Sequence, residues 1–278
     1  MVSPLILSLS KEEPFGRPRP ARLAPVPPPA YRSLMDPFAT IEAHRAELDA
    51  LRPLATEALR HLQRVWDVEL TYTSNAIEGN TLTLRETAEV IEHGIAVGGK
   101  PLKHHLEAVD HHEAVQWMRT LAGRAEPIGE ATVCELHRRI VLRSEPTIAG
   151  AYSTHRRRIA GSAVVFPNPA KLPTLMADFG GWLAAQPPTP AVAFDAHFRL
   201  TAIHPFSDGN GRTARLLMNL ILLRGGYVPV AVRPVDRAEY LKALEHGSTT
   251  GDLAPVTTLL AGRLLATLDE YLEALRER

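Results

Sequence analysis

From Asp36 onward, apolar residues recur at three-, four- and seven-residue steps, and this spacing predicts α-helices. The apolar positions of the first helical stretch are Ile41, Leu48, Leu51, Leu54, Leu59 and Leu62. Glycine or proline separates most of the later stretches. We expect these later helices at residues 102–121, 128–142, 172–185, 191–202, 212–223, 237–245 and 253–275. The pattern therefore predicts a mainly α protein, built as a multi-helix bundle.

One segment interrupts the helical pattern, at residues 150–169. It holds two short β-prone runs, 158–160 and 163–166, which Gly161 and Ser162 separate. Branched and aromatic residues on both sides of a glycine turn are typical of paired strands. We therefore expect a small β-hairpin here.

The N-terminal part of the chain differs in composition from the rest. Seven prolines within residues 14–30 remove so many backbone donors that an extended arm is expected. Further on, Thr83 and Glu86 stand in the order of a capping box, which predicts a helix that stops at Gly94. We expect four regions: a proline-rich arm at 1–35, a helical N-terminal region at 36–100, the domain core at 101–260 and the end of the C-terminal helix at 261–278.

The overall charge and hydropathy exclude several classes of protein. The chain has 278 residues, 45% of them apolar, and its 31 Lys and Arg residues balance 31 Asp and Glu residues. It therefore lacks the net basic field that draws proteins to nucleic acids or anionic membranes. Its apolar start has no basic residue before it, and no apolar run approaches the roughly 20 residues that span a bilayer. We expect a cytoplasmic protein with no nucleic-acid or membrane partner.

The chemically richest segment is residues 204–215, with the sequence His-Pro-Phe-Ser-Asp-Gly-Asn-Gly-Arg-Thr-Ala-Arg. An apolar helix follows it. Gly209 and Gly211 flank Asn210 where that helix begins, so backbone N–H groups can face an anion without a side chain in the way. The start of a helix favours phosphate through its free donors and its dipole. This segment therefore predicts an anion site.

Four side chains add further chemistry to this anion site. Arg212 and Arg215 are three residues apart on one helix face, so both can reach the same anion. The Asp208 carboxylate suits Mg2+, and His204 titrates near neutrality and can take a proton from a hydroxyl. The alternative is a plain glycine turn between two helices, which eight specified positions in one register make improbable. The residues predict a nucleoside triphosphate site, and the absence of a following Lys-Ser/Thr pair excludes a Walker A loop.

The same segment resembles the signature of the Fic family, His-x-Phe-x-Asp/Glu-Gly-Asn-Gly-Arg-x-x-Arg, at every specified position. The resemblance covers about residues 66–260 and implies a Fic fold with a β-hairpin flap. It also implies transfer of AMP from ATP to a Ser, Thr or Tyr hydroxyl of a target protein, with release of pyrophosphate. The roles implied are His204 as base, Asp208 as Mg2+ ligand, the loop from Asn210 to Arg212, with Gly211, as the anion hole, and Arg215 as the γ-phosphate ligand. Gly209 is a further candidate contact to the nucleotide.

A second motif lies far upstream and resembles the Fic inhibitory pattern Ser/Thr-x-x-x-Glu-Gly/Asn. It comprises Ser74, Glu78 and Gly79. The resemblance implies an N-terminal inhibitory helix at about 68–79, typical of class II Fic proteins, whose Glu78 pairs with Arg215 while Ser74 steadies the helix. An Arg215 occupied by a carboxylate cannot accept a phosphate, and we expect suppression of about 10- to 150-fold. Taken alone, the pattern also fits an ordinary helix end.

The resemblance gives the predicted hairpin a role as a flap that holds the target beside the catalytic histidine. The candidate flap residues are Arg156, Arg157, Arg158, Ile159, Ala160 and Gly161. On a later helix, Tyr240 is a candidate contact to the nucleotide. Leu241 and Ser248 stand where some relatives have Tyr and Asn near the adenine, which leaves the nucleobase preference open.

Several histidines lie outside these motifs. Two pairs of histidines are seven residues apart and return to one helix face: His104 and His105, and His111 and His112. One interpretation of this spacing is a metal site. Because the helix is charged and has no cysteine nearby, we expect surface histidines instead. His197 precedes His204 by seven residues and is expected to be a packed, hydrogen-bonded core histidine.

Together these features predict an autoinhibited protein AMP-transferase that uses ATP and Mg2+ or Mn2+. Its expected partners are ATP and a hydroxyl-bearing target protein, with the chain itself as one candidate target. Since some relatives form homodimers, a second copy of the chain is another candidate partner. Two alternatives stay open: a deAMPylase in which Glu78 orients a hydrolytic water, and a catalytically silent adaptor that binds nucleotide.

Overall fold

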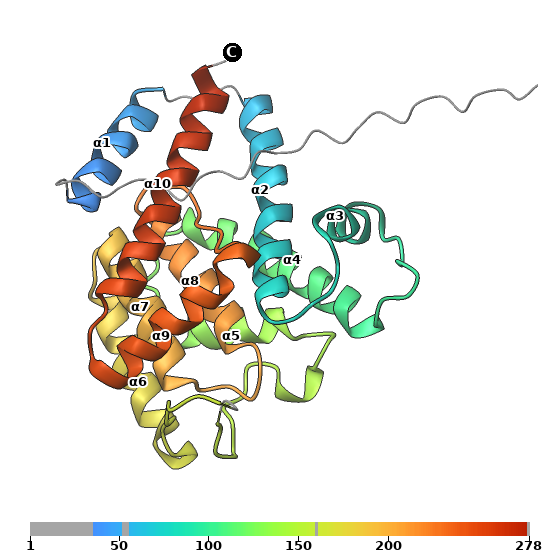
Figure 1. Ribbon diagram of the computed structural model, residues 1–278, viewed down its shortest axis with the longest axis vertical. Helices are drawn as coiled ribbons and strands as arrows, with labels where there is room; N and C mark the ends of the chain where they lie inside the picture. Colours follow the sequence, from blue (N-terminus) through green and yellow to red (C-terminus); the bar gives the residue numbers. More distant parts are fainter. Residues whose placement is uncertain (1–35, 52–55, 159–160, 277–278) are drawn as a thin grey trace, which may run out of the picture. The chain divides into compact units, whose positions relative to one another are not determined.

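The computed structural model describes residues 36–51, 56–158 and 161–276, with the side chains of 56–59 excepted. Within these residues the fold is mainly α, as predicted (Figure 1). The proline-rich arm expected at 1–35 lies outside the described residues, as do Ile159 and Ala160. The helices are α1 (Pro37–Ala50), α2 (Thr56–Ile77), α3 (Leu84–His93), α4 (Leu102–Ala122), α5 (Glu130–Ile140), α6 (Leu172–Ala184), α7 (Pro190–Ile203), α8 (Asn210–Arg224), α9 (Arg237–Thr250) and α10 (Ala254–Arg276).

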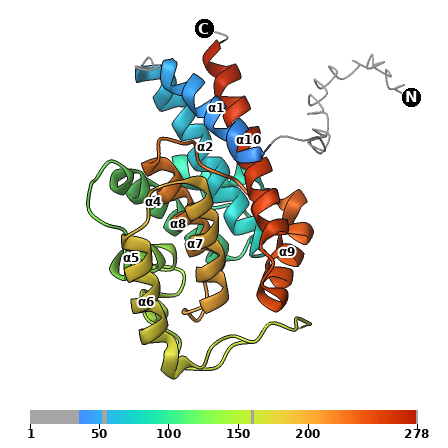
Figure 2. The same ribbon diagram turned by 90° about the vertical axis from the view of Figure 1, so that its left-hand side faces the viewer.

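Helix α8 is the central element of the bundle. It packs against α7, α4 and α5, and it meets the end of α2 (Figures 1 and 2). Its buried residues are Asn210, Arg212, Thr213, Ala214, Arg215, Leu216, Leu217, Met218, Asn219, Leu220, Ile221 and Leu222. A helix covered on nearly all sides is held by tertiary packing rather than by its own propensity. The first turn of α8, which carries the predicted anion site, is therefore fixed by the core below it.

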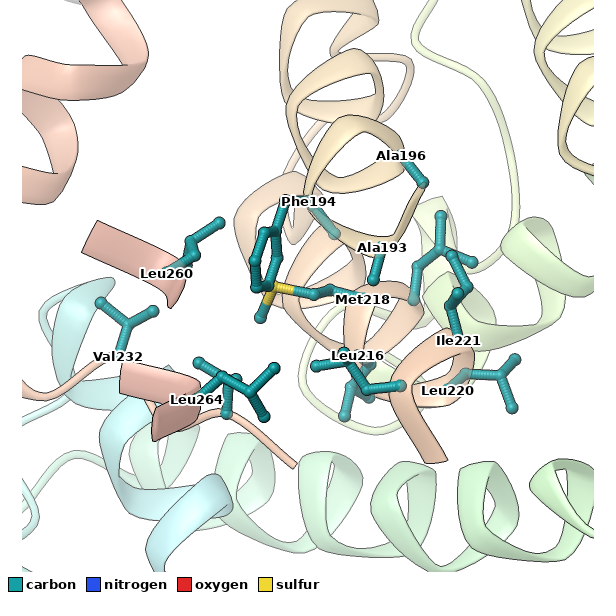
Figure 3. Packing of buried hydrophobic residues seen from close by; sticks show 14 of the residues in the cluster. Ala193, Phe194, Ala196, Leu216, Met218, Leu220, Ile221, Val232, Leu260 and Leu264 are labelled. Carbon is teal, nitrogen blue, oxygen red and sulfur yellow. The ribbon is translucent and has the colours of Figure 1, made fainter. Parts of the chain in front are cut away.

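The core around α8 is apolar and tightly packed. Figure 3 shows Met218 of α8 beside Phe194 and Ala193 of α7, with Leu260 and Leu264 of α10 nearby. All five side chains are 2% exposed or less. Alanines on α7 allow the two helices to approach closely, because a small side chain leaves room for a large one on its neighbour.

Local capping sets several of the helix ends. The predicted capping box is confirmed: Glu86 N–H donates to Thr83 Oγ1 at 3.2 Å, and Thr83 N–H donates to Glu86 Oε2 at 2.7 Å. The helix stops at Gly94, which adopts a left-handed φ of 65°. Helix α2 begins well before residue 68 and ends at Ile77, because Gly79 takes a φ of 97° that an α-helix cannot accommodate.

The expected hairpin within 150–169 is wrong in its described part. Residues 153–158 and 161–168 form no strand, and the isolated β-bridge recorded in this segment joins Tyr152 to Phe206. Side chains replace the cross-strand bonds: Val164 N–H donates to Ser162 Oγ at 3.2 Å, and Ala163 N–H donates to Glu245 Oε1 at 3.0 Å. Although residues 163–166 are β-prone, two of their backbone N–H groups bind side-chain oxygens instead of a neighbouring strand.

Two of the four clustered histidines were assigned wrongly to the surface. His105 is 9% exposed; its Nε2 accepts Val97 N–H at 2.9 Å and its Nδ1 lies 2.9 Å from the Pro101 carbonyl. His111 is 1% exposed. Because α2, α3, α5 and α8 all pack against α4, more than one face of this helix is covered despite its charged sequence.

No helix in the described ranges combines the length and the apolar character needed to cross a membrane.

The packing in Figure 3 predicts the effect of emptying the core beside α8. Replacing Met218, which is 0% exposed, with Ala should lower the free energy of unfolding by about 2 to 5 kcal/mol. Urea denaturation followed by circular dichroism measures this. Val235→Ala, at a side chain that is 82% exposed, is the matched control and should change the unfolding free energy by less than about 0.5 kcal/mol. Equal effects of the two variants would contradict the packing.

Candidate active site

The candidate site is built on the loop from His204 to Gly209, which joins α7 to α8. His204 ends α7 with a φ of 51°, the one positive φ at a non-glycine residue among those described. Its N–H donates to the Leu200 carbonyl at 3.0 Å and so closes the helix. A left-handed conformation is unfavourable for a residue with a β-carbon, and it persists where the surroundings enforce it. The chain therefore turns sharply at the candidate base.

Asn210 holds this turn together through its side chain. Its Oδ1 accepts Phe206 N–H at 2.9 Å, and its Nδ2 donates to the Phe206 carbonyl at 2.8 Å. Both polar atoms of the side-chain amide thus bind within the loop, while the backbone N–H of Asn210 lies at the start of α8. Asn210 is 3% exposed, so the clamp is buried.

His137 supports the loop from below, a role that motif matching did not reveal. Its ring stacks on Phe206 with a centroid distance of 3.7 Å and an interplanar angle of 1°. Nδ1 accepts Gly150 N–H at 3.0 Å, so the proton lies on Nε2, which donates to the Asp208 carbonyl at 3.0 Å. Burial lowers the His137 pKa to about 4, which keeps the ring neutral and this pattern intact at neutral pH. One signal for this role was available in the sequence: His137 lies within the part of the chain that resembles the Fic family, near the end of α5.

The first turn of α8 presents backbone donors, and a carboxylate already faces them. Gly209 opens the helix with a φ of 74°. A β-carbon at Gly211 would collide with Glu78 Oε1 and approach Arg215 Nη1 to 3.1 Å, so any side chain there would displace these groups. Glu78, from the turn after α2, therefore lies directly at the N-terminus of α8. The free donors and the helix dipole favour this negative charge, as they would favour a phosphate.

Arg215 is the side chain on which the two predicted motifs meet. It is 4% exposed; Nη2 donates to Glu78 Oε1 and to the Ser74 carbonyl, each at 2.8 Å, and Nε donates to Ser74 Oγ at 3.0 Å. Burial opposes its charge, but the Glu78 carboxylate and the Tyr240 hydroxyl outweigh burial and raise the Arg215 pKa. The structure thus brings Ser74, Glu78 and Arg215 together as the sequence predicted.

Arg212 faces a different group of residues. It is 1% exposed, with Nη2 at 3.4 Å from Asp208 Oδ2 and Nη1 at 3.5 Å from both Glu107 Oε1 and Asn75 Oδ1. Its guanidinium therefore links the loop to α4 and to the end of α2. Glu107 and Asn75 were not anticipated from the sequence, because neither belongs to the two motifs.

Asp208 is the candidate metal ligand, and its surroundings suit that role. The carboxylate is 48% exposed, and Oδ1 accepts the Gly209 N–H. The described residues hold no group of three or more His, Cys, Asp or Glu side chains arranged for a metal ion. A single exposed carboxylate fits Mg2+, which is commonly held by one or two carboxylates together with water and substrate phosphates. A site of this kind would be completed by the ligand rather than by the protein.

His204 lies under the aromatic ring of Phe166. The two rings stack with centroids 4.0 Å apart and an interplanar angle of 21°. Burial lowers the His204 pKa, which keeps the imidazole neutral at neutral pH and able to accept a proton. Nδ1 lies 3.4 Å from the Thr201 carbonyl, so a proton on Nδ1 leaves Nε2 as the basic atom.

Tyr240 and the flap residues complete the predicted set. Tyr240 is 1% exposed, its hydroxyl lies 2.8 Å from His197 Nε2 and against Arg215, and so it supports the arginine from inside the core. His197, 0% exposed, is the hydrogen-bonded core histidine that we predicted. In the flap, Arg157 Nε donates to Ser153 Oγ at 3.2 Å, while the remaining described candidates are exposed: Arg156, Arg158 and Gly161.

Known proteins share this fold. A family model described as "Fic/DOC family" matches residues 127–222. The structure of Fic-1 (aa134–508) from Caenorhabditis elegans superposes with a TM-score of 0.75 at 32% identity, covering 86% of this chain and 71% of that one. The chain belongs to the Fic/DOC family. A Fic domain containing signaling protein from Bacteroides thetaiotaomicron gives a TM-score of 0.79 at 27% identity, covering 86% and 97% of the two chains.

Curated relatives extend the likeness in sequence. "Protein adenylyltransferase Fic" of Nematostella vectensis is 40% identical over 206 residues, which are 72% of this chain and 48% of that protein. The protein of the same name from Drosophila willistoni is 35% identical over 242 residues, which are 85% and 48% of the two chains. The chain thus spans about half the length of these relatives.

The stack of Phe166 on His204 predicts a shift in the basicity of the histidine. Phe166→Ala removes part of the burial that disfavours the imidazolium, so the His204 pKa should rise toward its ordinary value of about 6.5. An NMR titration of the His204 ring proton measures this. Val165→Ala, at the exposed neighbour, should leave that pKa where it is. A His204 pKa that stays the same or falls in Phe166→Ala would show that the ring does not desolvate the base.

Proposed function

We propose that this Fic protein is a protein AMP-transferase whose active site is restrained by its own Glu78. The observation that supports the restraint is the position of the Glu78 carboxylate, 2.8 Å from Arg215 and against Gly211 at the N-terminus of α8. A phosphate group would need the same donors and the same space. The names of the curated relatives, protein adenylyltransferases, support the reaction class.

The proposed reaction joins AMP to a hydroxyl group of a target protein. His204 Nε2 takes the proton of a Ser, Thr or Tyr hydroxyl, and the hydroxyl oxygen attacks the α-phosphorus of ATP. The bond between the α-phosphorus and its bridging oxygen to the β-phosphate breaks, and pyrophosphate leaves. Backbone N–H groups at the start of α8 stabilise the charge that develops on the α-phosphate. His204 is neutral before the reaction, as a base must be.

The two arginines and Asp208 would serve the rest of the triphosphate. Arg215 would bind the γ-phosphate once Glu78 has moved away, with Ser74 still holding its Nε. Asp208 would hold Mg2+ or Mn2+, which when bound supplies positive charge to the phosphate oxygens. Arg212 lies 3.4 Å from the same carboxylate and would hold its orientation. The flap, with Arg156 to Gly161 as its candidate target contacts, would present the target next to His204.

The strength of the restraint follows from the Glu78–Arg215 pair. A hydrogen bond to a charged group contributes about 1.5 to 3 kcal/mol, and exposure to water reduces that contribution. The Glu78 side chain is 39% exposed while that of Arg215 is 5% exposed. We therefore place the suppression near the lower end of the predicted range, at about tenfold.

Removing the Glu78 charge tests the restraint. In Glu78→Gly, and in the isosteric Glu78→Gln, transfer of radiolabelled AMP from ATP to protein should rise about tenfold or more, because Arg215 and the start of α8 are released. His204→Ala in the same background should abolish the transfer. Glu92→Gln, at an exposed residue near the end of α3, is the control for loss of one carboxylate.

Other outcomes would point to other functions. Nucleotide binding by calorimetry without transfer in any variant would support a silent adaptor. Release of AMP from a pre-modified protein by the wild-type chain, lost in Glu78→Gly, would support a deAMPylase.

A metal titration tests the role of Asp208. In the Glu78→Gly background, Asp208→Asn should raise the Mg2+ concentration for half-maximal AMP transfer about 10- to 100-fold, the usual effect of weakening a metal site. Mn2+ should follow the same trend. An unchanged Mg2+ requirement would exclude Asp208 as a ligand. The control for the altered local charge is Glu145→Gln, which removes the carboxylate that pairs with Lys103 near Asp208.

A further inference from the structure

Glu245 on α9 makes a contact that neither predicted motif includes. Its Oε1 accepts two hydrogen bonds from the flap, from Ser162 Oγ at 2.7 Å and from Ala163 N–H at 3.0 Å. The partners are 83 and 82 residues away along the chain. The two bonds lower the Glu245 pKa, so the carboxylate is charged at neutral pH.

An anchor of this kind matters because the described residues of the flap form no strand. In its described part, residues 161–168 have no strand partner. Within this stretch Val164 N–H turns back to Ser162 Oγ, the same hydroxyl that Glu245 binds. The backbone of the flap is thus ordered by a hydroxyl and a carboxylate rather than by a ladder of strand bonds.

The helix that carries Glu245 is itself locked to the helix that ends at the catalytic base. On one side of Glu245, Tyr240 bonds His197 of α7 at 2.8 Å. On the other side, Gly247 lies so close to Phe198 of α7 that a β-carbon would come within 2.7 Å of the ring. Helix α9 therefore cannot shift along α7 without breaking one of these contacts.

The far end of the same flap segment touches the base directly. Phe166 stacks on His204 at 4.0 Å, only three residues after Ala163. The segment 162–166 is therefore fixed at both ends, to α9 by Glu245 and to His204 by Phe166. The two anchor points thus lie on α9 and at the end of α7, and these helices contact each other through Tyr240 and Gly247.

We infer that Glu245 is a positioning residue that sets the place of the flap relative to His204, and so the place of the target hydroxyl. This rests on the proposed AMP transfer, and it assigns the recognition of the target to α9 as well as to the flap. Glu245 acts through Ser162 and Ala163 and is not expected to contact the triphosphate. It therefore governs the use of the target protein and not the affinity for ATP.

Trypsin cleavage tests the anchor without relying on activity. In the whole 278-residue chain, Glu245→Ala should speed the first cuts after Arg156, Arg157 or Arg158 about tenfold, since two hydrogen bonds are lost. Mass spectrometry of the early fragments measures this. Glu245→Gln keeps an acceptor oxygen and should fall between wild type and Ala. Glu239→Ala, on the exposed surface of the same helix, is the matched control, and trypsin should cleave it at the wild-type rate. Equal cutting of Glu245→Ala and wild type would overturn the proposal.

Activity then separates positioning of the target from binding of the nucleotide. In the Glu78→Gly background, Glu245→Ala should reduce AMP transfer to protein about tenfold while the KM for ATP stays within about twofold. A rise in the KM for ATP with an unchanged rate at saturation would overturn the proposal by placing Glu245 at the nucleotide. If Glu78→Gly itself transfers no AMP while the trypsin result holds, the proposed reaction fails and the anchoring role of Glu245 stands.

Discussion

The buried Arg215 guanidinium is the group on which the arrangement of this site depends. A charge removed from water must be paired and hydrogen-bonded, and here the partners come from the end of α2: Ser74 through two of its oxygens and Glu78 through its carboxylate. Tyr240 of α9 adds its hydroxyl. Three helices distant in sequence are therefore brought together around one side chain. Because Ser74 binds Arg215 without using a charge, the arginine keeps neutral partners if the carboxylate moves away.

The rest of the structure keeps the start of α8 in place for this interaction. Burial of twelve residues of α8 fixes the helix, the Asn210 amide closes the loop in front of it, and His137 fills the space below Phe206. Each of these groups is neutral or paired, so none competes for an incoming anion. Asp208 is paired with Arg212, yet its carboxylate is 48% exposed and within reach of a metal ion.

Sequence patterns predicted the parts of this fold that depend on local rules. The capping box at Thr83, the central helix after Arg212 and the twelve-residue signature each follow from residues that act on their near neighbours in sequence. The wrong predictions concern features that depend on contacts between residues distant in sequence. His111 is buried because α2 and α8 cover α4, which its charged sequence did not suggest. In the described part of the predicted hairpin, the Ala163 N–H donates to a glutamate 82 residues further along the chain and not to a neighbouring strand.

The contact between Glu78 and Gly211 places a tethered carboxylate where a free anion would bind. The two would therefore compete for one site. The carboxylate belongs to the same molecule, so under the proposed restraint it would compete with an incoming anion at an effective concentration rather than at a bulk one. For segments joined by short linkers that concentration is on the order of millimolar, and a packed helix that aims the group raises it further. Occupancy of the anion site by Glu78 would then depend on how firmly the end of α2 is held. The stability of one helical turn would therefore set the affinity of the site for a free ligand.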